Sequence, residues 1–265
     1  MTLGDQKAMF RGPAEVYDRY VGRYSPSLAR AMCNAAGVRP GQSALDVGCG
    51  SGALVVALAV ILGEENVAGV DPSEPFVEAA RAKVPGARLT VAAAESLPFE
   101  DGTFDVTLSQ LVVNFLSDPE GGLREMARVT RSGGVVAGCV WDYSGGMTML
   151  RAFWETAAAL DPQGATPLME QHTMRFSRPD ELRDLWQSSF TGVTVSPIDA
   201  EASYEDFDDL WAPLPTGVGP AGAYAASLDP DAQEQLRDEF RRRLGDPQGA
   251  FTLSARAWCA VGSTP

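Results

Sequence analysis

The sequence predicts an α/β fold built on a doubly wound, mostly parallel β-sheet. Between Gln42 and Tyr143, short apolar runs alternate with amphipathic segments of helical periodicity. The runs are rich in Val, Ala and Leu and are apolar nearly throughout, which is typical of parallel strands buried on both faces. A glycine-rich turn joins the first run to the segment that follows it. Strands that alternate with helices in this way form right-handed βαβ units.

This central region is expected to contain five strands with helices between them. The strands are Ser43–Val47, Val67–Val70, Arg88–Ala92, Phe104–Ser109 and Val135–Val140. One helix follows Gly52, a second runs from Pro72-Ser73 to Lys83, and a third is Glu120–Thr130.

The pattern changes after Tyr143. Helices are expected at Met147–Leu160, Pro179–Ser188 and Asp231–Leu244, and strands at Val193–Ile198 and Thr252–Val261. The two strands are candidates for an antiparallel pair at one edge of the sheet. The Pro/Gly stretch that ends at residue 178 and the segment WAPLPTGVGPAG (211–222) are expected to be loops. The insertions 144–178 and 201–249 are expected at the carboxyl edge of the strands, where open α/β sheets bind ligands.

Composition narrows the class of protein. The 265 residues are 45% hydrophobic and 21% charged, which is ordinary for a globular domain. The net charge of −14 argues against a nucleic-acid partner, because such binding requires Lys and Arg to neutralise phosphates. The longest apolar stretch, Ala53–Leu62, is too short to span a bilayer, and the opening MTLGDQKAMF lacks the order of a signal peptide. Four scattered cysteines fit neither a zinc site nor a disulfide framework, so we expect a cytoplasmic protein without a metal.

The most informative stretch is LDVGCGSG, in which a strand enters a tight turn and then a helix. Gly48, Gly50 and Gly52 allow unusual backbone angles and the close approach of a ligand. A dinucleotide is the rival ligand, because the turn also fits G-x-G-x-x-A and Asp71 lies about 20 residues further on. Asp46 at the mouth of the turn would repel a pyrophosphate, whereas S-adenosylmethionine presents an ammonium and a sulfonium. The chain also has no Tyr-x-x-x-Lys pair, and its single histidine, His172, has no evident dehydrogenase partner. The two features together favour S-adenosylmethionine.

Asp71 ends the second expected strand, in the motif GVDPS. Its carboxylate can accept charge-assisted hydrogen bonds from both hydroxyls of a ribose. The alternative is an N-cap for a helix that begins at Pro72, since proline is favoured at the first helical position. The glycine turn that precedes Asp71 favours the ribose role.

Four motifs in register resemble the class I S-adenosylmethionine-dependent methyltransferases: LDVGCGSG, GVDPS, AAAESLPFEDGTFDV and TRSGGVVAGCVWDY. They resemble in particular the group typified by ubiquinone and menaquinone biosynthesis methyltransferases, and the resemblance covers about residues 42–143. It implies a Rossmann-like sheet of seven strands whose last strand is antiparallel. One departure is Ser132, where the group usually has proline, and it should affect only the stiffness of a hairpin.

The resemblance also implies the parts of a cofactor site. The glycines of the turn border the methionine part, Asp71 holds the ribose, an Ala-Glu pair borders the adenine, and a Ser-Gln pair lies beneath the sulfonium. Similar methyltransferases use an N-terminal aromatic on the cofactor's carboxylate, and three tyrosines share one helix face near the start of this chain. Core packing is the alternative for these tyrosines. The expected set is Tyr17, Tyr24, Asp46, Gly48, Gly50, Gly52, Asp71, Pro72, Ala94, Glu95, Ser96, Ser109 and Gln110.

Catalytic residues are harder to read, because a sulfonium is already activated and the protein mainly has to align the reactants. His172, the one histidine, is a candidate general base, although a histidine in a polar loop is more often a surface residue. Asp142 and Tyr143 are alternatives at the carboxyl edge of the fifth strand. Methionines and aromatic residues of the insertions suit either an apolar substrate pocket or ordinary helix packing. These are Met147, Met149, Phe153, Trp154, Met169 and Met174.

The sequence therefore predicts one methyltransferase domain that transfers a methyl group by SN2 displacement to a small, apolar or aromatic molecule. An S-adenosylmethionine-binding protein with other chemistry, or a sensor, is the alternative. The expected division is an N-terminal helical cap (1–41), a cofactor-binding core (42–143), two helical lids (144–178 and 201–249), and a final helix with edge strands (179–200 and 250–265). The atom that is methylated and the oligomeric state cannot be read from the sequence.

Overall fold

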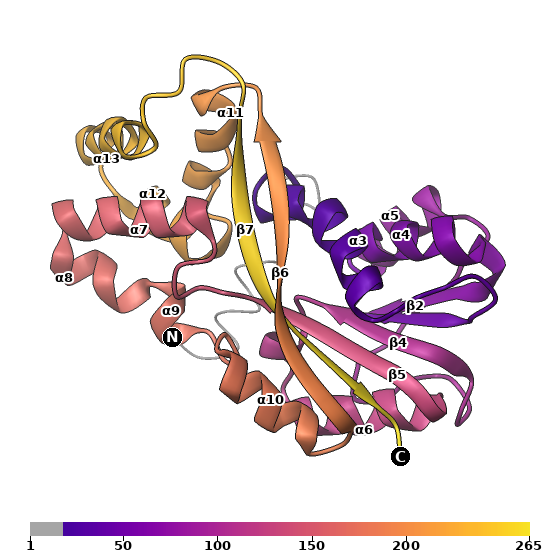
Figure 1. Cartoon of the computed structure of the whole chain (residues 1–265). Helices are drawn as coiled ribbons and strands as arrows, with labels where there is room; N and C mark the ends of the chain where they lie inside the picture. The colour runs from indigo at the N-terminus through magenta and orange to yellow at the C-terminus, as the bar shows by residue number, and fades with distance from the viewer. Residues whose placement is uncertain (1–17) are drawn as a thin grey trace. The chain divides into compact units, whose positions relative to one another are not determined.

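The computed structural model describes residues 18–265, and a seven-stranded sheet is its central feature (Figure 1). The strand order is β3-β2-β1-β4-β5-β7-β6. The strands are β1 (Ala44–Val47), β2 (Val67–Asp71), β3 (Arg88–Val91), β4 (Phe104–Gln110), β5 (Thr130–Trp141), β6 (Thr191–Tyr204) and β7 (Phe251–Ser263). Strands β1 to β5 pair in parallel, and β7 pairs antiparallel with β5. The predicted mostly parallel sheet is confirmed.

Helices cover both faces of this sheet, as the alternation of strands and helices predicts. Figure 1 shows α3 (Ser25–Ala35), α4 (Ala53–Leu62) and α5 (Glu74–Lys83) on one face. Helices α6 (Pro119–Val129) and α10 (Pro179–Gln187) lie on the other. Both faces are sealed by side chains without solvent exposure, which explains the nearly continuous apolar character of the strands. Examples are Leu28, Leu45, Leu54, Leu58, Leu108, Leu123 and Met126.

The described residues form two compact units. The helical unit comprises the chain up to Tyr24 together with Asp142–Met174 and Ala200–Arg256. The sheet unit comprises Ser25–Trp141, Arg175–Asp199 and Ala257–Pro265. The chain passes between the units within β6 and β7, which are longer than the strands expected from the sequence. Both expected insertions fall almost entirely in the helical unit.

The helical unit is built from short elements around two longer helices. The long helices are α7 (Thr148–Leu160) and α13 (Pro230–Arg243), close to their expected bounds. The remaining elements are η1 (Val21–Tyr24), α8 (Pro162–Ala165), η4 (Thr166–Leu168), α9 (Glu170–Thr173), α11 (Phe207–Trp211), η5 (Leu214–Thr216) and α12 (Gly219–Ser227). The rings of Phe153 and Phe240 pack edge to face at 5.7 Å and join the two long helices.

The loop predicted at 211–222 is wrong for its last four residues, where helix α12 begins at Gly219. Pro220 occupies the first turn of the helix, where proline costs no hydrogen bond. Gly222 is buried in the helix, and a Cβ atom there would lie 3.0 Å from the carbonyl oxygen of Leu214. The small residues that suggest a flexible loop therefore serve the close packing of a helix. The stretch 162–173 also differs from the predicted loop, because it forms α8, η4 and α9.

Candidate functional site

The glycine turn after β1 combines left-handed backbone with two different steric environments. Gly48, Gly50 and Gly52 have φ values of 79°, 49° and 93°. A Cβ atom on Gly48 would lie 2.4 Å from Cγ2 of Val112, so the turn is packed tightly there. A Cβ atom on Gly50 would meet nothing within 4 Å. Gly50 is therefore the point of the turn at which a ligand can approach the backbone.

Hydrogen bonds fix this turn to the end of the neighbouring strand β2. The amides of Gly48 and Cys49 both donate to the carbonyl oxygen of Val70, each at 2.8 Å. The amide of Gly50 donates to Oδ2 of Asp71 at 3.0 Å, and the amide of Ser73 donates to Oδ1 at 2.9 Å. Asp71 thus holds the turn and the start of the next helix together.

The structure does not place Asp71 at a helix N-cap, so that alternative is wrong. Helix α5 begins at Glu74, its N-cap residue is Ser73, and its proline in the first turn is Pro75. Pro72 is exposed and precedes the helix. Burial raises the pKa of Asp71, while the hydrogen bonds from Ser73 and Gly50 oppose that rise.

Asp46 lies one strand away, on β1, and is the most unusual polar group of the sheet unit. Its side chain is 1% exposed, and neither carboxylate oxygen has a hydrogen-bond partner among residues 18–265. Burial raises its pKa well above the usual range, and the nearby Asp71 carboxylate adds to the rise. A buried carboxylate that lacks donors is costly, and a cation beside it relieves the cost. The group therefore fits the ammonium of S-adenosylmethionine and disfavours a pyrophosphate.

Ser109 and Gln110 end β4 on the other side of β1. The Ser109 hydroxyl is buried and donates to the carbonyl oxygen of Val47 at 3.0 Å, which ties β4 to the entry of the glycine turn. The Gln110 amide nitrogen donates to the carbonyl oxygen of Ser25 at 3.3 Å, while its buried Oε1 has no partner within the described chain. Leu111 follows with a φ of 62°, a conformation rare for a bulky residue. The chain therefore turns sharply where the site is expected.

Glu95 follows β3 and is half-buried, with Ala94 buried and Ser96 exposed beside it. Its Oε1 accepts a hydrogen bond from the amide of Ser117 at 3.2 Å, with the amide of Asp118 at 3.5 Å. These contacts link the end of β3 to the segment before α6. The structure thus brings together the expected residues of β1, β2, β3 and β4 at the carboxyl ends of neighbouring strands.

The other expected site residues belong to the helical unit, apart from Tyr17, which lies outside the described residues. Tyr24 is fully buried, and its hydroxyl accepts a hydrogen bond from the Tyr204 hydroxyl at 3.3 Å. Burial raises the pKa of Tyr24 far above its usual range. Asp142 shapes the turn after β5, because its Oδ1 accepts from the Ser144 amide at 3.1 Å. Its backbone carbonyl accepts from the amides of residues 146 and 147.

The candidate base residues differ in exposure. His172 lies exposed on α9, with Nε2 at 3.1 Å from the side-chain nitrogen of Gln171. Tyr143 is half-buried. Burial raises the pKa of Tyr20 most, and Glu170 and Tyr143 add to the rise. The roles of His172, Asp142 and Tyr143 stay predictions.

Glu170 is a buried acid that the sequence analysis missed. Its side chain is 3% exposed and accepts hydrogen bonds from the Trp154 indole N–H and from the Ala221 amide. Burial raises its pKa to about 7 in spite of these donors. Its neighbours Gln171 and His172 are polar and exposed, so no local pattern distinguishes it. Trp154 of helix α7 and Ala221 of helix α12 contact its carboxylate, so its surroundings depend on other parts of the chain.

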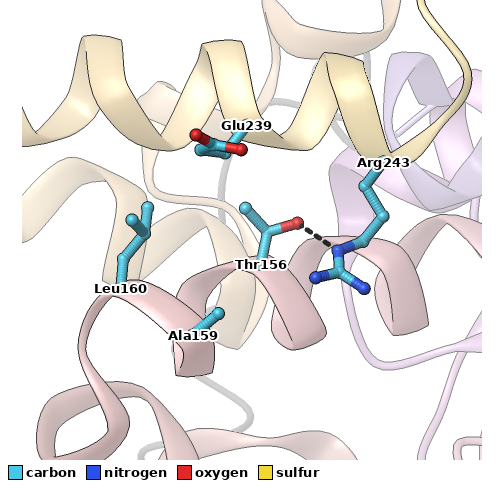
Figure 2. Close-up of a pocket in the computed structure, with 5 residues that line it drawn as sticks. All are labelled: Thr156, Ala159, Leu160, Glu239 and Arg243. Atoms are coloured by element: carbon cyan, nitrogen blue, oxygen red, sulfur yellow. Dashed lines mark hydrogen bonds between the residues drawn. The ribbon is translucent and has the colours of Figure 1, made fainter.

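A pocket with a volume of about 250 Å³ lies on the helical unit, and Figure 2 shows its lining residues on α7 and α13. It is lined by Thr156, Ala159, Leu160, Glu239 and Arg243. The Arg243 guanidinium donates to the hydroxyl of Thr156 and to Glu155, each at 2.9 Å. Its cation is therefore satisfied by the protein, and none of the expected site residues lines this pocket.

An open α/β sheet with a glycine turn and acidic side chains at the ends of adjacent strands defines a Rossmann-like nucleotide-binding protein. Residues 45–138 match the family model described as "Methyltransferase domain". The demethylmenaquinone methyltransferase of Roseiflexus castenholzii is 31% identical over 210 residues, which is 70% of this chain and 86% of that protein. This chain belongs to the class I S-adenosylmethionine-dependent methyltransferases, in the group that resembles the ubiquinone and menaquinone enzymes.

Two other similar proteins match this chain less completely or differ from it in reaction. An uncharacterised 37.1 kDa protein of transposon TN4556 from Streptomyces fradiae is 37% identical over 112 residues, which is 41% of this chain and only 32% of that protein. The solved structure of the [4+2]-cyclase SpnF shares the fold, with a TM-score of 0.51, 17% identity, and coverage of 90% of this chain and 81% of that one. Fold alone therefore does not specify the reaction. No helix within residues 18–265 is long and apolar enough to cross a membrane.

Proposed function

We propose that this protein transfers the methyl group of S-adenosylmethionine to a small, largely apolar or aromatic acceptor. The observation that carries the proposal is the buried Asp46 carboxylate, which lacks a hydrogen-bond partner in the described chain and lies at the mouth of the glycine turn. An ammonium group is the chemical complement of such a carboxylate.

Each part of the site in the sheet unit has a distinct task in this proposal. Gly50 lets the methionine part of the cofactor approach the backbone, and Asp46 attracts its ammonium. Asp71 accepts hydrogen bonds from the ribose hydroxyls with the lone pairs that the Gly50 and Ser73 amides leave available. Glu95 borders the adenine. The cofactor, when bound, supplies an electrophilic methyl group, so the protein mainly has to hold donor and acceptor in line.

The name of a relative and the net charge of this chain support a small, largely apolar acceptor. The Roseiflexus castenholzii relative is named as a demethylmenaquinone methyltransferase, which supports a small-molecule acceptor. The net charge of −14 disfavours a polyanionic acceptor. We infer that the insertions 144–178 and 201–249 act as a lid over the acceptor. Met147, Met149, Phe153 and Trp154 are buried side chains of the first insertion and supply the apolar surface.

Product analysis tests the proposal. The protein is incubated with S-adenosylmethionine and a panel of phenols, reduced quinones and amines, and the products are examined by mass spectrometry. We expect a gain of one methyl group on an aromatic acceptor, together with S-adenosylhomocysteine. Asp46→Asn is the matched variant, because it keeps the side-chain shape and removes the charge. Transformation of an acceptor without transfer of the methyl group would support non-methylating chemistry instead.

A further inference from the structure

Helix α4 of the sheet unit is apolar on every side. Its ten residues, ALVVALAVIL, include no polar side chain. Leu54, Leu58 and Leu62 are buried on the side that faces the sheet. Val56 and Val60 lie on the opposite side of the helix and are 38% and 83% exposed. A helix that is apolar all round is normally buried all round, so one face of α4 lacks the cover that its sequence predicts.

Helix α4 is the middle one of three helices that share this face of the sheet (Figure 1). Helix α3 contacts β5, α4 contacts β1 and β2, and α5 contacts β2 and β3. Because the strand order is β3-β2-β1-β4-β5, the helices follow one another across the face as α5, α4 and α3. The exposed valines therefore lie at the centre of a helical layer, with α3 on one side and α5 on the other.

The charge of this layer differs from that of the whole chain. The net charge of −14 repels a second copy of the chain. Residues 25–91 contain five Lys or Arg and six Asp or Glu, and two of the acids, Asp46 and Asp71, are buried. The exposed charges of this segment therefore nearly cancel. Two copies can approach each other through this layer with little of the repulsion that the rest of the chain causes.

Two exposed charges of opposite sign flank α4. Arg30 lies near the middle of α3 and Glu78 near the middle of α5, and neither side chain has an ion-pair or hydrogen-bond partner among residues 18–265. A two-fold axis parallel to α4 places α4 against α4 and α3 of one copy opposite α5 of the other. Arg30 then faces Glu78 of the second copy, and symmetry forms this contact twice. An axis perpendicular to α4 would instead place Arg30 opposite Arg30.

We propose that two copies of this chain form a symmetric dimer in which the Val56 and Val60 faces of their α4 helices pack together. An Arg30–Glu78 ion pair between the copies lies on each side of this contact. The second copy supplies the apolar cover that α4 lacks, and the contact is self-complementary. The ion pairs lie at its rim and fix the orientation more than they add affinity. This dimer goes beyond the proposed function and does not depend on it.

Sedimentation velocity of the full-length protein tests the dimer. A contact centred on one helix predicts weak association, so the measurement covers about 1 to about 100 μM. We expect a species of twice the chain mass to form as the concentration rises. Val60→Glu should raise the dissociation constant at least about 10-fold, because it buries an unpaired carboxylate. The control is Leu160→Glu, which makes the same change at an exposed apolar residue of the helical unit and should leave association unchanged.

The outcomes that contradict the dimer are distinct. Equal weakening by Val60→Glu and Leu160→Glu would place the contact elsewhere and overturn the proposal. A monomer at every concentration would leave the face of α4 to a lipid surface or to another protein, and would also overturn it. Flotation with phosphatidylcholine vesicles tells these two occupants apart. Because Val60 is exposed, Val60→Glu should barely change the melting temperature of the dilute protein, which checks that the variant is folded.

Charge reversal tests the orientation of the two copies. Arg30→Glu and Glu78→Arg each place like charges opposite each other across the contact, so each should raise the dissociation constant about 5-fold or more. The variant with both substitutions restores opposite charges and should return the dissociation constant to nearly the wild-type value. Failure of the double variant to restore association would overturn the proposed two-fold arrangement.

A cysteine at position 60 gives a second, independent measurement. The four native cysteines are all buried, so Val60→Cys adds an accessible thiol. Residues near a two-fold axis lie opposite themselves in the second copy. A short bis-maleimide should therefore join two chains through position 60, whereas Leu160→Cys should stay a single chain under the same conditions. Equal cross-linking of the two variants, or none at position 60, would overturn the proposal.

Discussion

The Asp71 carboxylate accepts a hydrogen bond from the Gly50 amide at 3.0 Å, so the expected ribose ligand also braces the glycine turn. The two residues are 21 positions apart and belong to neighbouring strand ends. This contact links the shape of the turn to the ionised state of Asp71. A substitution at Asp71 should therefore affect both the cofactor and the free protein.

For Asp71, two variants separate these effects. Asp71→Ala removes both the ribose contacts and the brace, so we expect affinity for S-adenosylhomocysteine to fall about 10- to 150-fold, together with a lower melting temperature. Asp71→Asn keeps one carbonyl oxygen for a backbone amide, and its melting temperature should fall less than that of Asp71→Ala. Calorimetry and thermal unfolding measure the two quantities. Unchanged affinity in both variants would remove Asp71 from the cofactor site.

The glycine turn predicts different outcomes for two similar substitutions. Gly48→Ala places a methyl group 2.4 Å from a Val112 methyl and should cost about 1–3 kcal/mol of stability in addition to backbone strain. Gly50→Ala meets no atom within 4 Å, so it should cost only the strain of a positive φ, about 1–2 kcal/mol, yet weaken cofactor binding.

A double-mutant cycle checks the origin of the Gly48 effect. Combining Gly48→Ala with Val112→Ala should cost at least about 1 kcal/mol less than the sum of the single variants. Denaturant unfolding provides the free energies. Additive values would show that backbone strain, and not the Val112 contact, dominates.

The helical unit contains an ion pair between Arg23 and Asp209, and a second arginine near the same carboxylate provides a control for it. Arg23 donates from both terminal nitrogens to Asp209, including Nη1 to Oδ2 at 2.7 Å, and its side chain is 19% exposed. Arg19 lies 3.7 Å from the same carboxylate but is 61% exposed. We expect Arg23→Ala to cost about 1–3 kcal/mol and Arg19→Ala to cost at most about 0.5 kcal/mol. Equal effects would contradict the difference in burial.

The same pair sets a pH dependence. The hydrogen bond from Arg23 lowers the pKa of Asp209 below the ordinary 3.8. The stability that Asp209 contributes is therefore present above the unfolded pKa and is lost as the pH falls through the lowered folded pKa. The difference in unfolding free energy between the wild type and Asp209→Asn should shrink in acid. A difference that stays constant down to low pH would contradict the ion pair.

Much of the fold could be predicted because local patterns and the tertiary structure agree. The strands around Leu45, Leu108 and Val136 are buried on both faces, and their apolar runs show this directly. Helix α12 was missed because its glycines and proline are the usual signals of a turn, and only the close approach of Gly222 to Leu214 reveals their purpose.

Some residues of the candidate sites could also be predicted from local sequence motifs, and others could not. Asp46 and Gly50 lie in one local motif and Asp71 lies in a second, and the chemistry of both motifs can be read from the sequence. Glu170 and Tyr20 are 150 residues apart in the numbering, and their common burial depends on how the helical unit folds. The spacing of the N-terminal tyrosines offers core packing for Tyr20, whereas no local pattern distinguishes Glu170, because its burial depends on tertiary structure.

Calorimetric titration with S-adenosylhomocysteine and with NAD tests the central claim most directly. The account predicts that the wild-type protein binds S-adenosylhomocysteine and that Asp46→Asn weakens this binding about 10-fold, because the ammonium of the ligand loses its charged partner. NAD should bind weakly to the wild type, since Asp46 repels its pyrophosphate, and Asp46→Asn should not weaken that binding. Tight binding of NAD with no response to S-adenosylhomocysteine would contradict the account.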